Sequence, residues 1–313
     1  MSEIPSSRST LYAPLYVITA AVLWGTTGVA VKLSNVADTS PLMPAAARNL
    51  LATTLIGVYL LLIDRRALCI KPKDICSMAL LGVVGVGLCQ LSYIFTVTQA
   101  YVGVAVLLQS LAPTFAYAWA LIKHSEKFSK QKLSALALAL GGGATVVLGQ
   151  GGWGGAISPT GLVSGVISGL CWAFYSIYAK SLMHAYSSWT LLFWGNAFAS
   201  LAWLFILPPQ SLIGWCITKP NALVASLYLA VACTAIPSWF YLKGMRTLTP
   251  STAGIIGAFE PVAATLLAYL VLHETLALTQ IIGGFVIIVA LILLQCTTVR
   301  REAITEPSAV ITA

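Results

Sequence analysis

The stretch WGTTGVAVK at residues 24–32 recurs as WAFYSIYAK at residues 172–180, with Trp first and Lys last in both copies. Two further pairs share the same offset of 148 residues: Pro113 with Pro261, and Glu126 with Glu274. Landmarks at one constant offset indicate an internal duplication. We therefore expect one five-helix repeat in residues 1–150, a second in 151–300, and a short cytoplasmic tail at 301–313.

The composition predicts an all-α integral membrane protein. Hydrophobic residues make up 58% of the chain and charged residues 8%, whereas soluble domains have roughly 25% charged residues. The mean hydropathy is +0.90. Apolar runs of about 20 residues, the length that crosses a ~30 Å hydrocarbon core, are expected as ten transmembrane helices, five in each half. They lie near 14–33, 43–63, 75–97, 102–122, 133–149, 160–180, 189–207, 222–242, 252–272 and 278–297.

The odd number of spans in each half has a geometric consequence. The second half must enter the membrane from the opposite side, so the sequence predicts two inverted copies. Inverted repeats related by an axis in the membrane plane are the plan of many secondary transporters, which hold their site near the midplane and open it alternately to each side.

The formal charge of +8 comes from basic residues in alternate loops. These residues are Arg65, Arg66, Lys71, Lys73, Lys123, Lys127, Lys130, Lys132, Lys243, Arg246, Arg300 and Arg301. Because Lys and Arg stay on the cytoplasmic side, we expect both termini in the cytoplasm of a multi-pass protein of the cell inner membrane. Basic residues spread in this way do not form a nucleic-acid surface, so no nucleic-acid partner is expected.

The sequence lacks the patterns of cofactor and metal sites. Its seven cysteines include no Cys-x-x-Cys pair, and its three histidines are far apart, unlike metal-ligand spacings. No Walker-type phosphate loop, His-Glu-x-x-His or Gly-x-Ser-x-Gly motif is present. We therefore expect no cofactor, no metal and no catalytic residues, which disfavours both an enzyme and an ATP-driven pump.

Glu260 is a charge near the middle of the ninth predicted span. Acids at membrane depth are costly and by default indicate function. Pro261 follows and removes a backbone hydrogen bond, which predicts a kink beside the carboxyl group. Two functional hypotheses are binding of a cationic or amine group and exchange of a proton; the alternative is a protonated Glu that only packs against another helix.

Arg48 is the second charge within a predicted span, with Asn49 beside it. Its long side chain can simply reach the membrane interface. Alternatively, Arg48 anchors a substrate carboxylate or pairs with Glu260, since Arg forms bidentate pairs with carboxylates.

Polar and aromatic residues recur at the centres of other spans. At helical spacing they predict a mostly apolar pocket with a few orienting hydrogen bonds, although each member can instead serve helix packing. The candidate substrate-binding residues, besides Arg48, Asn49 and Glu260, are Trp24, Gln90, Tyr93, Gln109, Trp172, Tyr175, Asn196 and Trp239. Pro113 and Pro261 are candidate kink or gating positions, and Gly161, Gly165 and Gly169 predict close helix packing.

Several of these landmarks carry a family resemblance. Leu23-Trp24-Gly25 with Lys32, Arg48, Leu111-Ala112-Pro113 followed by Glu126, and Phe259-Glu260-Pro261 followed by His273-Glu274 resemble the EamA-type branch of the drug/metabolite transporter superfamily. The resemblance covers about residues 15–298. It implies two inverted five-helix repeats, a central cavity, and movement of amino acids, other small metabolites or toxic compounds, often outward. Ala112 stands where the second copy has Glu260, so the repeat offers no symmetric pair of acids.

The leading functional hypothesis is a secondary transporter that exports small organic metabolites, with amino acids or related compounds first among them, by alternating access. The expected partners are a small-molecule substrate, the lipid bilayer and protons as a candidate coupling ion, and the expected assembly is a monomer or homodimer. One alternative is an efflux carrier for multiple drugs or cationic compounds. A second is a non-transporting membrane scaffold or receptor, for which the short loops leave little surface.

Overall fold

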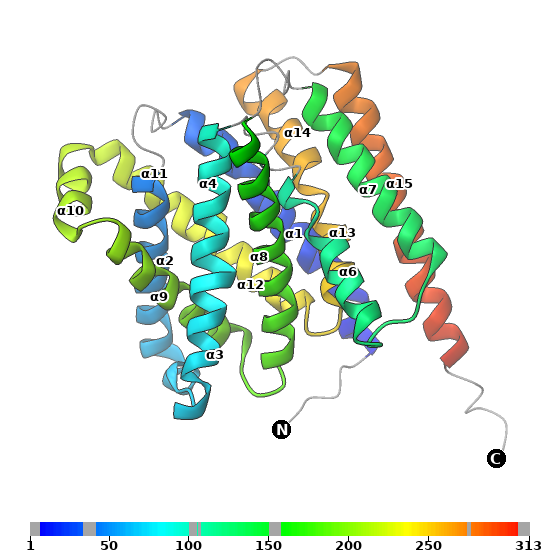
Figure 1. Ribbon diagram of the computed structural model, residues 1–313, viewed down its shortest axis with the longest axis horizontal. Coiled ribbons are helices and arrows are strands. Elements are labelled where there is room, and N and C mark those ends of the chain that lie inside the picture. Colours follow the sequence, from blue (N-terminus) through cyan, green and yellow to red (C-terminus); the bar gives the residue numbers. More distant parts are fainter. Residues whose placement is uncertain are drawn as a thin grey trace.

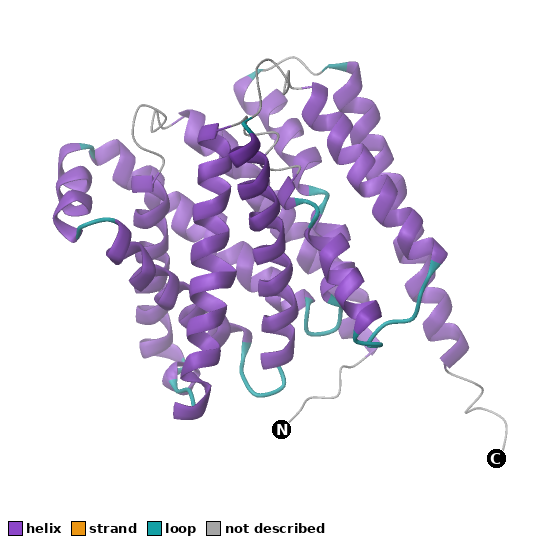
Figure 2. Cartoon of the chain, viewed as in Figure 1, coloured by secondary structure: helices purple, strands orange, loops and turns teal. Residues whose placement is uncertain are grey.

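A computed structural model describes residues 7–33, 42–99, 105, 108–149, 158–273 and 277–305. All regular structure in these ranges is helical, as Figure 2 shows, and they contain no strand. The all-α prediction is therefore confirmed for the described part of the chain. Six helical segments there are long and apolar enough to cross a membrane: Leu42–Ile63, Pro72–Thr96, Pro159–Leu182, Ser188–Ile206, Leu223–Gly244 and Pro250–Val271.

The two halves contain equivalent series of helices. The first half has α1 (Ser7–Leu33), α2 (Leu42–Ile63), the short turns η2 (Arg65–Leu68) and η3 (Pro72–Asp74), α3 (Ile75–Leu80), η4 (Leu81–Leu88), α4 (Cys89–Gln99), α6 (Ala112–Ile122) and α7 (Lys130–Gly149). The second half has α8 (Pro159–Leu182), α9 (Ser188–Ile206), α10 (Pro209–Thr218), α11 (Pro220–Ala230), η5 (Val231–Ala235), α12 (Ile236–Gly244), α13 (Pro250–Gly257), α14 (Glu260–Leu272) and α15 (Leu278–Thr305).

The halves interlock by exchanging their first helices. Helix α1 packs against α12 and α14 of the second half, and α8 packs against α4 and α6 of the first half. Helix α2 lies against α9, while α7 and α15 run side by side along one edge of the molecule (Figure 1). Because each half covers the other's first helix, the centre of the protein is built from both repeats.

Two spans that were predicted as plain helices contain wider π-helical turns. Segment η4 separates α3 from α4, and η5 separates α11 from α12. Positions equivalent to η4 in the second repeat are 229–236, and η5 lies within that range. In the second half, Pro237 cannot donate a backbone hydrogen bond, while Thr234 Oγ1 donates to the Leu229 carbonyl five residues earlier at 2.9 Å. Single π-turns of this kind are frequent at functional sites.

The ninth predicted span, 252–272, is a broken helix rather than a continuous one. Helix α13 ends at Gly257, and α14 begins with Glu260 and Pro261. The equivalent break in the first half lies at 110–111, immediately before Ala112 and Pro113 begin α6. Pro is favourable in a first helical turn, where its missing N–H has no intrahelical partner to lose. Both prolines therefore restart a helix after a break.

Three other expectations about helix bounds need correction. Helix α10 lies between the predicted spans 189–207 and 222–242, where only a loop was expected. Apolar runs of membrane-spanning length do not indicate it, because its ten residues are too few to span a bilayer. Helix α1 begins at Ser7 and α15 continues to Thr305, so part of the expected non-helical termini is helical. The predicted span 102–122 lies partly outside the described residues. The Gly-rich stretch 150–155, which the sequence predicts as a short linker between the halves, lies wholly outside them.

Glycines bring helix backbones together, as the spacing of the α8 glycines predicts. A Cβ added at Gly169 would lie 2.7 Å from the Leu108 carbonyl oxygen, and one at Gly165 would clash with the Leu108 side chain. The same close approach joins α7 to α15, where a Cβ at Gly142 would lie 2.8 Å from the Gly283 carbonyl oxygen. A Cβ at the neighbouring Gly141 meets nothing within 4 Å.

This difference between adjacent glycines is testable. The Gly142→Ala variant should destabilise the protein by about 1–3 kcal/mol because the α7–α15 contact is overpacked. The matched variant Gly141→Ala should be neutral or stabilise by up to about 1 kcal/mol, since Ala is the better helix former. Thermal unfolding midpoints of the purified proteins in detergent measure the difference. Equal midpoints would contradict the contact.

Glu126, one of the repeat landmarks, joins the first half to the start of α13. Its Oε2 atom accepts a hydrogen bond from the Lys132 ammonium, and its Oε1 atom accepts one from Ser251 Oγ at 2.8 Å. The Lys132 ammonium also donates to Thr249 Oγ1 at 3.2 Å. Thr249 Oγ1 in turn caps α13 by accepting from the Thr252 backbone N–H. The landmark acid is thus a structural tie between the two repeats.

Burial is the largest single influence on the pKa of the Glu126 carboxyl group, and by itself it would raise that pKa. The hydrogen bond and charge of Lys132, with the hydroxyl groups of Ser251 and Thr249, outweigh burial. The pKa of Glu126 therefore lies below its ordinary value of 4.5. Because the folded-state pKa is lowered, the tie stabilises the fold above the ordinary pKa, and this stabilisation is lost as the pH falls through the folded-state value.

The sign of this linkage gives a second prediction. At pH 7, Glu126→Gln should lower the free energy of unfolding by about 1–3 kcal/mol, since a charge-assisted hydrogen bond is lost. Below pH 4.5 the difference between the wild type and the variant should shrink. Thermal or denaturant unfolding at several pH values between 7 and about 3 measures it. A difference that stays constant over this range would argue against the ionised tie.

Candidate functional site

Two equivalent tryptophans meet at the centre of the molecule. Trp24 of α1 and Trp172 of α8 contact each other edge to face, with their ring centroids 5.5 Å apart. Since these residues occupy the same position in the two repeats, a direct contact places them at the axis that relates the repeats. Tyr175 stacks on Trp172 at 5.2 Å. Three of the candidate residues therefore lie together.

Tyr241 of α12 completes this aromatic cluster, although the sequence analysis did not select it. Its ring lies 5.5 Å from Trp24 and 5.4 Å from Trp172, and its hydroxyl group is 2.9 Å from Ser176 Oγ. Tyr241 is 148 positions after Tyr93, so the repeat offset contained the signal. We call Trp24, Trp172, Tyr175 and Tyr241 the central aromatic cluster.

Arg48, Tyr93 and Glu260 form a charged group beside this cluster. They come from α2, α4 and the start of α14, and they lie close enough for their charges to interact. Cys233 of η5 is also within electrostatic reach of Arg48. Close packing at Gly25 places the two groups next to each other. Gly25 follows Trp24, and a Cβ atom at Gly25 would lie 2.9 Å from the Ala264 backbone of α14, the helix that begins with Glu260.

The charged side chains in this group are not neutralised by direct contact. Arg48 and Glu260 form no ion pair within the described residues, and the Glu260 carboxylate accepts no hydrogen bond there. The buried Arg48 Nε atom has no hydrogen-bond partner in that part of the structure. Because an unpaired polar group away from water is costly, the arrangement favours a polar ligand that satisfies these atoms. We refer to Arg48 and Glu260, together with the Tyr93 phenol between the same helices, as the charged triad.

Asn49 and Gln90 form a reciprocal amide pair next to the charged triad. Asn49 Nδ2 donates to Gln90 Oε1 at 2.6 Å, and Gln90 Nε2 donates back to Asn49 Oδ1 at 3.3 Å. Asn49 is fully buried. Arg48 and Tyr93 extend from the same two helices, so the amide pair fixes the distance between α2 and α4 where two members of the triad begin.

Gln109 and Asn196 are placed separately from the triad. Gln109 Nε2 donates to Ser168 Oγ at 2.9 Å and lies 3.4 Å from Cys89 Sγ, which ties it to α8 and α4. Asn196 is buried on α9 and donates to the Leu192 carbonyl of its own helix at 2.8 Å, while its Oδ1 atom has no partner in the described residues.

Trp239 lies in a different aromatic group. It stacks on Trp189 at the start of α9, with ring centroids 5.4 Å apart, and the Lys243 ammonium lies 4.5 Å from its ring centroid. The indole N–H of Trp194 also has its partner elsewhere, since it donates to the Leu68 carbonyl of η2. Neither tryptophan contacts a ring of the central aromatic cluster in the described structure. Sequence position alone did not distinguish these rings from the central ones.

The remaining candidates concern helix ends and metal binding. Lys180 donates to the Met245 carbonyl and, at 2.9 Å, to the Arg246 carbonyl after α12, so it caps another helix of the same repeat. The Lys32 side chain and Glu274 lie outside the described residues. Within the described ranges, no three His, Cys, Asp or Glu side chains form a group that could hold a metal ion.

The apolar helices and the duplicated, interlocked fold are those of a multi-pass membrane protein. The model of the EamA-like transporter family matches the sequence twice, at residues 11–148 and 159–296. The chain therefore belongs to the EamA-like transporter family, a family of membrane transporters. The two matched ranges begin and end 148 positions apart, which is the offset of the repeated landmarks.

Named relatives and a solved structure agree with this family. The chain is 27% identical to the inner membrane transporter YicL of Salmonella typhimurium, over 94% of this chain and 98% of that protein. It is 26% identical to protein PecM of Dickeya dadantii, over 88% and 90%. A crystal structure at 17% sequence identity has a TM-score of 0.74 and covers 93% of this chain and 98% of its own, which shows a shared fold.

The Asn49–Gln90 pair gives a prediction that separates a structural role from ligand binding. Asn49→Leu or Gln90→Leu alone should destabilise the protein by about 1–3 kcal/mol, because each leaves a buried amide unpaired. The double variant should be less destabilised than the sum of the single changes. Thermal unfolding of the four proteins measures this coupling. Additive losses would mean that the two amides do not depend on each other.

Proposed function

We propose that this protein is a secondary transporter of the inner membrane that exports small organic metabolites, with amino acids or related compounds as the leading class. Its family supports transport, and the name of its relative YicL supports the inner membrane. The exported compound binds between the repeats, at the charged triad and the central aromatic cluster. The remaining candidate residues, including Gln109 and Asn196, position the helices around it.

The observation that carries the substrate proposal is the charged triad. Glu260 and Arg48 are opposite charges that lie near each other without forming an ion pair in the described structure. A molecule with an amine and a carboxylate can bind both side chains. Its carboxylate accepts hydrogen bonds from the Arg48 guanidinium, whose buried Nε has no partner in the described structure. Its amine faces Glu260. The aromatic cluster offers an apolar wall for the rest of the substrate.

The duplicated fold supports alternating access as the transport mechanism. We propose ten spans in two inverted repeats with both termini in the cytoplasm. The N-terminal end of helix α1 and the C-terminal end of helix α15 lie on the same side of the bundle in Figure 1. The breaks before Ala112 and Glu260, and the π-turns η4 and η5, occupy equivalent positions and serve as bending points. As these helices bend, Trp24 and Trp172 separate and open the site to one side.

An efflux carrier for cationic compounds is the second candidate function. The observation that favours it is the Glu260 carboxylate, which accepts no hydrogen bond and forms no ion pair from the described residues. A cation next to aromatic rings is further stabilised by their negative faces. In this version a proton taken up by Glu260 removes the negative charge that holds the cation, and the positive charge of Arg48 then repels the cation. Transport is therefore proton-coupled.

Purified protein in liposomes tests both versions. Counterflow of labelled amino acids and of a quaternary ammonium compound should be measured for the wild type, Glu260→Gln and Arg48→Lys. If the substrate is zwitterionic, both variants should slow amino-acid transport at least about 10-fold, because Lys cannot replace bidentate Arg. Lys127→Gln changes an exposed loop charge and should transport normally.

The same assay has clear opposing outcomes. Transport of the quaternary cation but not of amino acids would select the second function, and an imposed pH gradient that drives wild type but not Glu260→Gln would assign Glu260 to proton exchange. Unchanged transport by folded Glu260→Gln and Arg48→Lys would remove the charged triad from the mechanism.

A further inference from the structure

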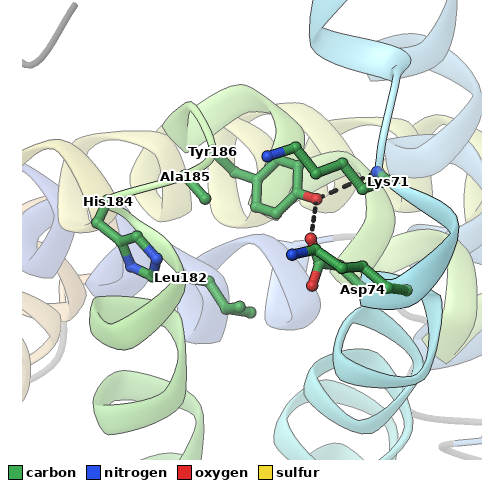
Figure 3. A pocket seen from close by; sticks show the side chains of 7 residues that line it. Lys71, Asp74, Leu182, His184, Ala185 and Tyr186 are labelled. Carbon is green, nitrogen blue, oxygen red and sulfur yellow. Dashed lines mark hydrogen bonds between the residues drawn. The ribbon is translucent and has the colours of Figure 1, made fainter.

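A cavity away from the central site lies between the two repeats. It has a volume of about 310 Å³ and is lined by Lys71, Lys73, Asp74, Leu182, His184, Ala185 and Tyr186. The first three residues belong to the η2–η3 region of the first repeat, and the others belong to the end of α8 and the turn that follows it. Figure 3 shows these two segments facing each other across the cavity.

One wall of this cavity is fixed by hydrogen bonds. The Tyr186 hydroxyl donates to Asp74 Oδ2 at 2.5 Å and accepts from the Lys71 backbone N–H at 3.1 Å, as Figure 3 shows. Arg246 Nη2 donates to the Tyr186 carbonyl at 2.8 Å and so stabilises the turn between α8 and α9. Since Tyr186 is buried, the wall has a defined shape before any ligand arrives.

The side chains at the cavity carry an excess of positive charge. Lys71 and Lys73 bring two ammonium groups, and neither ammonium forms an ion pair with Asp74 or donates to another group in the described structure. One Asp74 oxygen is already bonded to Tyr186. His184 Nδ1 donates to the Ser181 carbonyl, so Nε2 of the neutral ring carries the lone pair and can accept a hydrogen bond from a hydroxyl group of a ligand. The cavity therefore favours an anion.

The position of the cavity limits the source of that anion. It lies where three candidate membrane spans end or begin: Pro72–Thr96, Pro159–Leu182 and Ser188–Ile206. Residues at the ends of spans lie at the level of lipid headgroups. Leu182 supplies an apolar surface beside the lysines, as an acyl chain or glycerol group needs. Basic pockets between membrane helices bind anionic lipid headgroups.

We propose that this cavity binds an anionic phosphate group, carried by a phospholipid headgroup or by a soluble phosphate ester, and that the bound ligand bridges the two repeats. The ammonium groups of Lys71 and Lys73 hold the phosphate oxygens from the first repeat. From the α8–α9 turn of the second repeat, His184 Nε2 accepts a hydrogen bond from a hydroxyl group of the same ligand, such as the glycerol hydroxyl of a headgroup or ester. A ligand held from both sides stabilises the folded protein by mass action.

Thermal unfolding in nanodiscs tests the proposal. Wild type should be measured in phosphatidylcholine alone, in phosphatidylcholine with phosphatidylglycerol, and in phosphatidylcholine with added soluble glycerol phosphate. The Lys71→Gln/Lys73→Gln double variant removes both ammonium groups. Lys127→Gln/Lys130→Gln is its matched control, because it removes two exposed charges from the α6–α7 loop and the first residue of α7 and leaves the cavity unchanged.

The proposal expects a higher unfolding midpoint for the wild type and the matched control with one of the two phosphate sources. Stabilisation by phosphatidylglycerol alone assigns a lipid headgroup, whereas stabilisation by glycerol phosphate assigns a soluble ester. In a lipid or ester titration the cavity variant should bind about 30-fold more weakly, the factor for two basic residues near an anionic group. Equal stabilisation of both double variants, or of no protein, would overturn the proposal.

Discussion

The contact between Trp24 and Trp172 is the constraint around which the rest of the protein is arranged. Two residues at the same position of a duplicated sequence can touch only at the axis that relates the copies. That contact requires α1 and α8 to cross the centre, each packed against helices of the other half. Aromatic pairs contribute about 0.5–1.5 kcal/mol beyond their buried area, so the cluster also stabilises the junction that a transporter must open.

The interrupted helices are arranged around this junction. Backbone groups left unpaired by a break or a π-turn cannot face lipid, because the hydrocarbon offers them no hydrogen bond. The breaks before α6 and α14 and the turns η4 and η5 therefore belong in the protein interior, where side chains such as Thr234 satisfy them. Glu260 lies at one of these breaks, so the irregular backbone and a charge that is costly in a membrane occur at the same place.

The sequence predicted much of the fold because hydrophobic length and a repeated pattern are local signals. The described parts of the ten expected apolar runs are largely helical, with breaks at 110–111 and 258–259, and the landmark offset coincides with the two family matches. Helix α10 was missed because a ten-residue helix does not carry the signal of a long apolar run. The break before Glu260 was predicted only as a kink, since a proline indicates a disturbed helix without fixing its extent.

The candidate site was predicted less completely than the fold. Side-chain type selected Arg48, Tyr93 and Glu260, which the structure brings within electrostatic reach. The same reasoning selected Trp239, which packs elsewhere on Trp189, and it overlooked Tyr241. A tryptophan has the same composition signal in a central cluster and at a helix end, so only the packing of the helices distinguishes the two.

The sequence by itself determined that the chain is a duplicated, apolar, helical membrane protein with an acid in the second copy where the first has Ala112. These properties follow from composition, run length and offset, which do not depend on distant contacts. The tertiary structure decided which residues meet: the exchange of α1 and α8, the contact of Trp24 with Trp172, and the cavity shared by Lys71 and Tyr186. Such contacts depend on helix rotation and crossing, and a sequence that is hydrophobic on most faces leaves both undetermined.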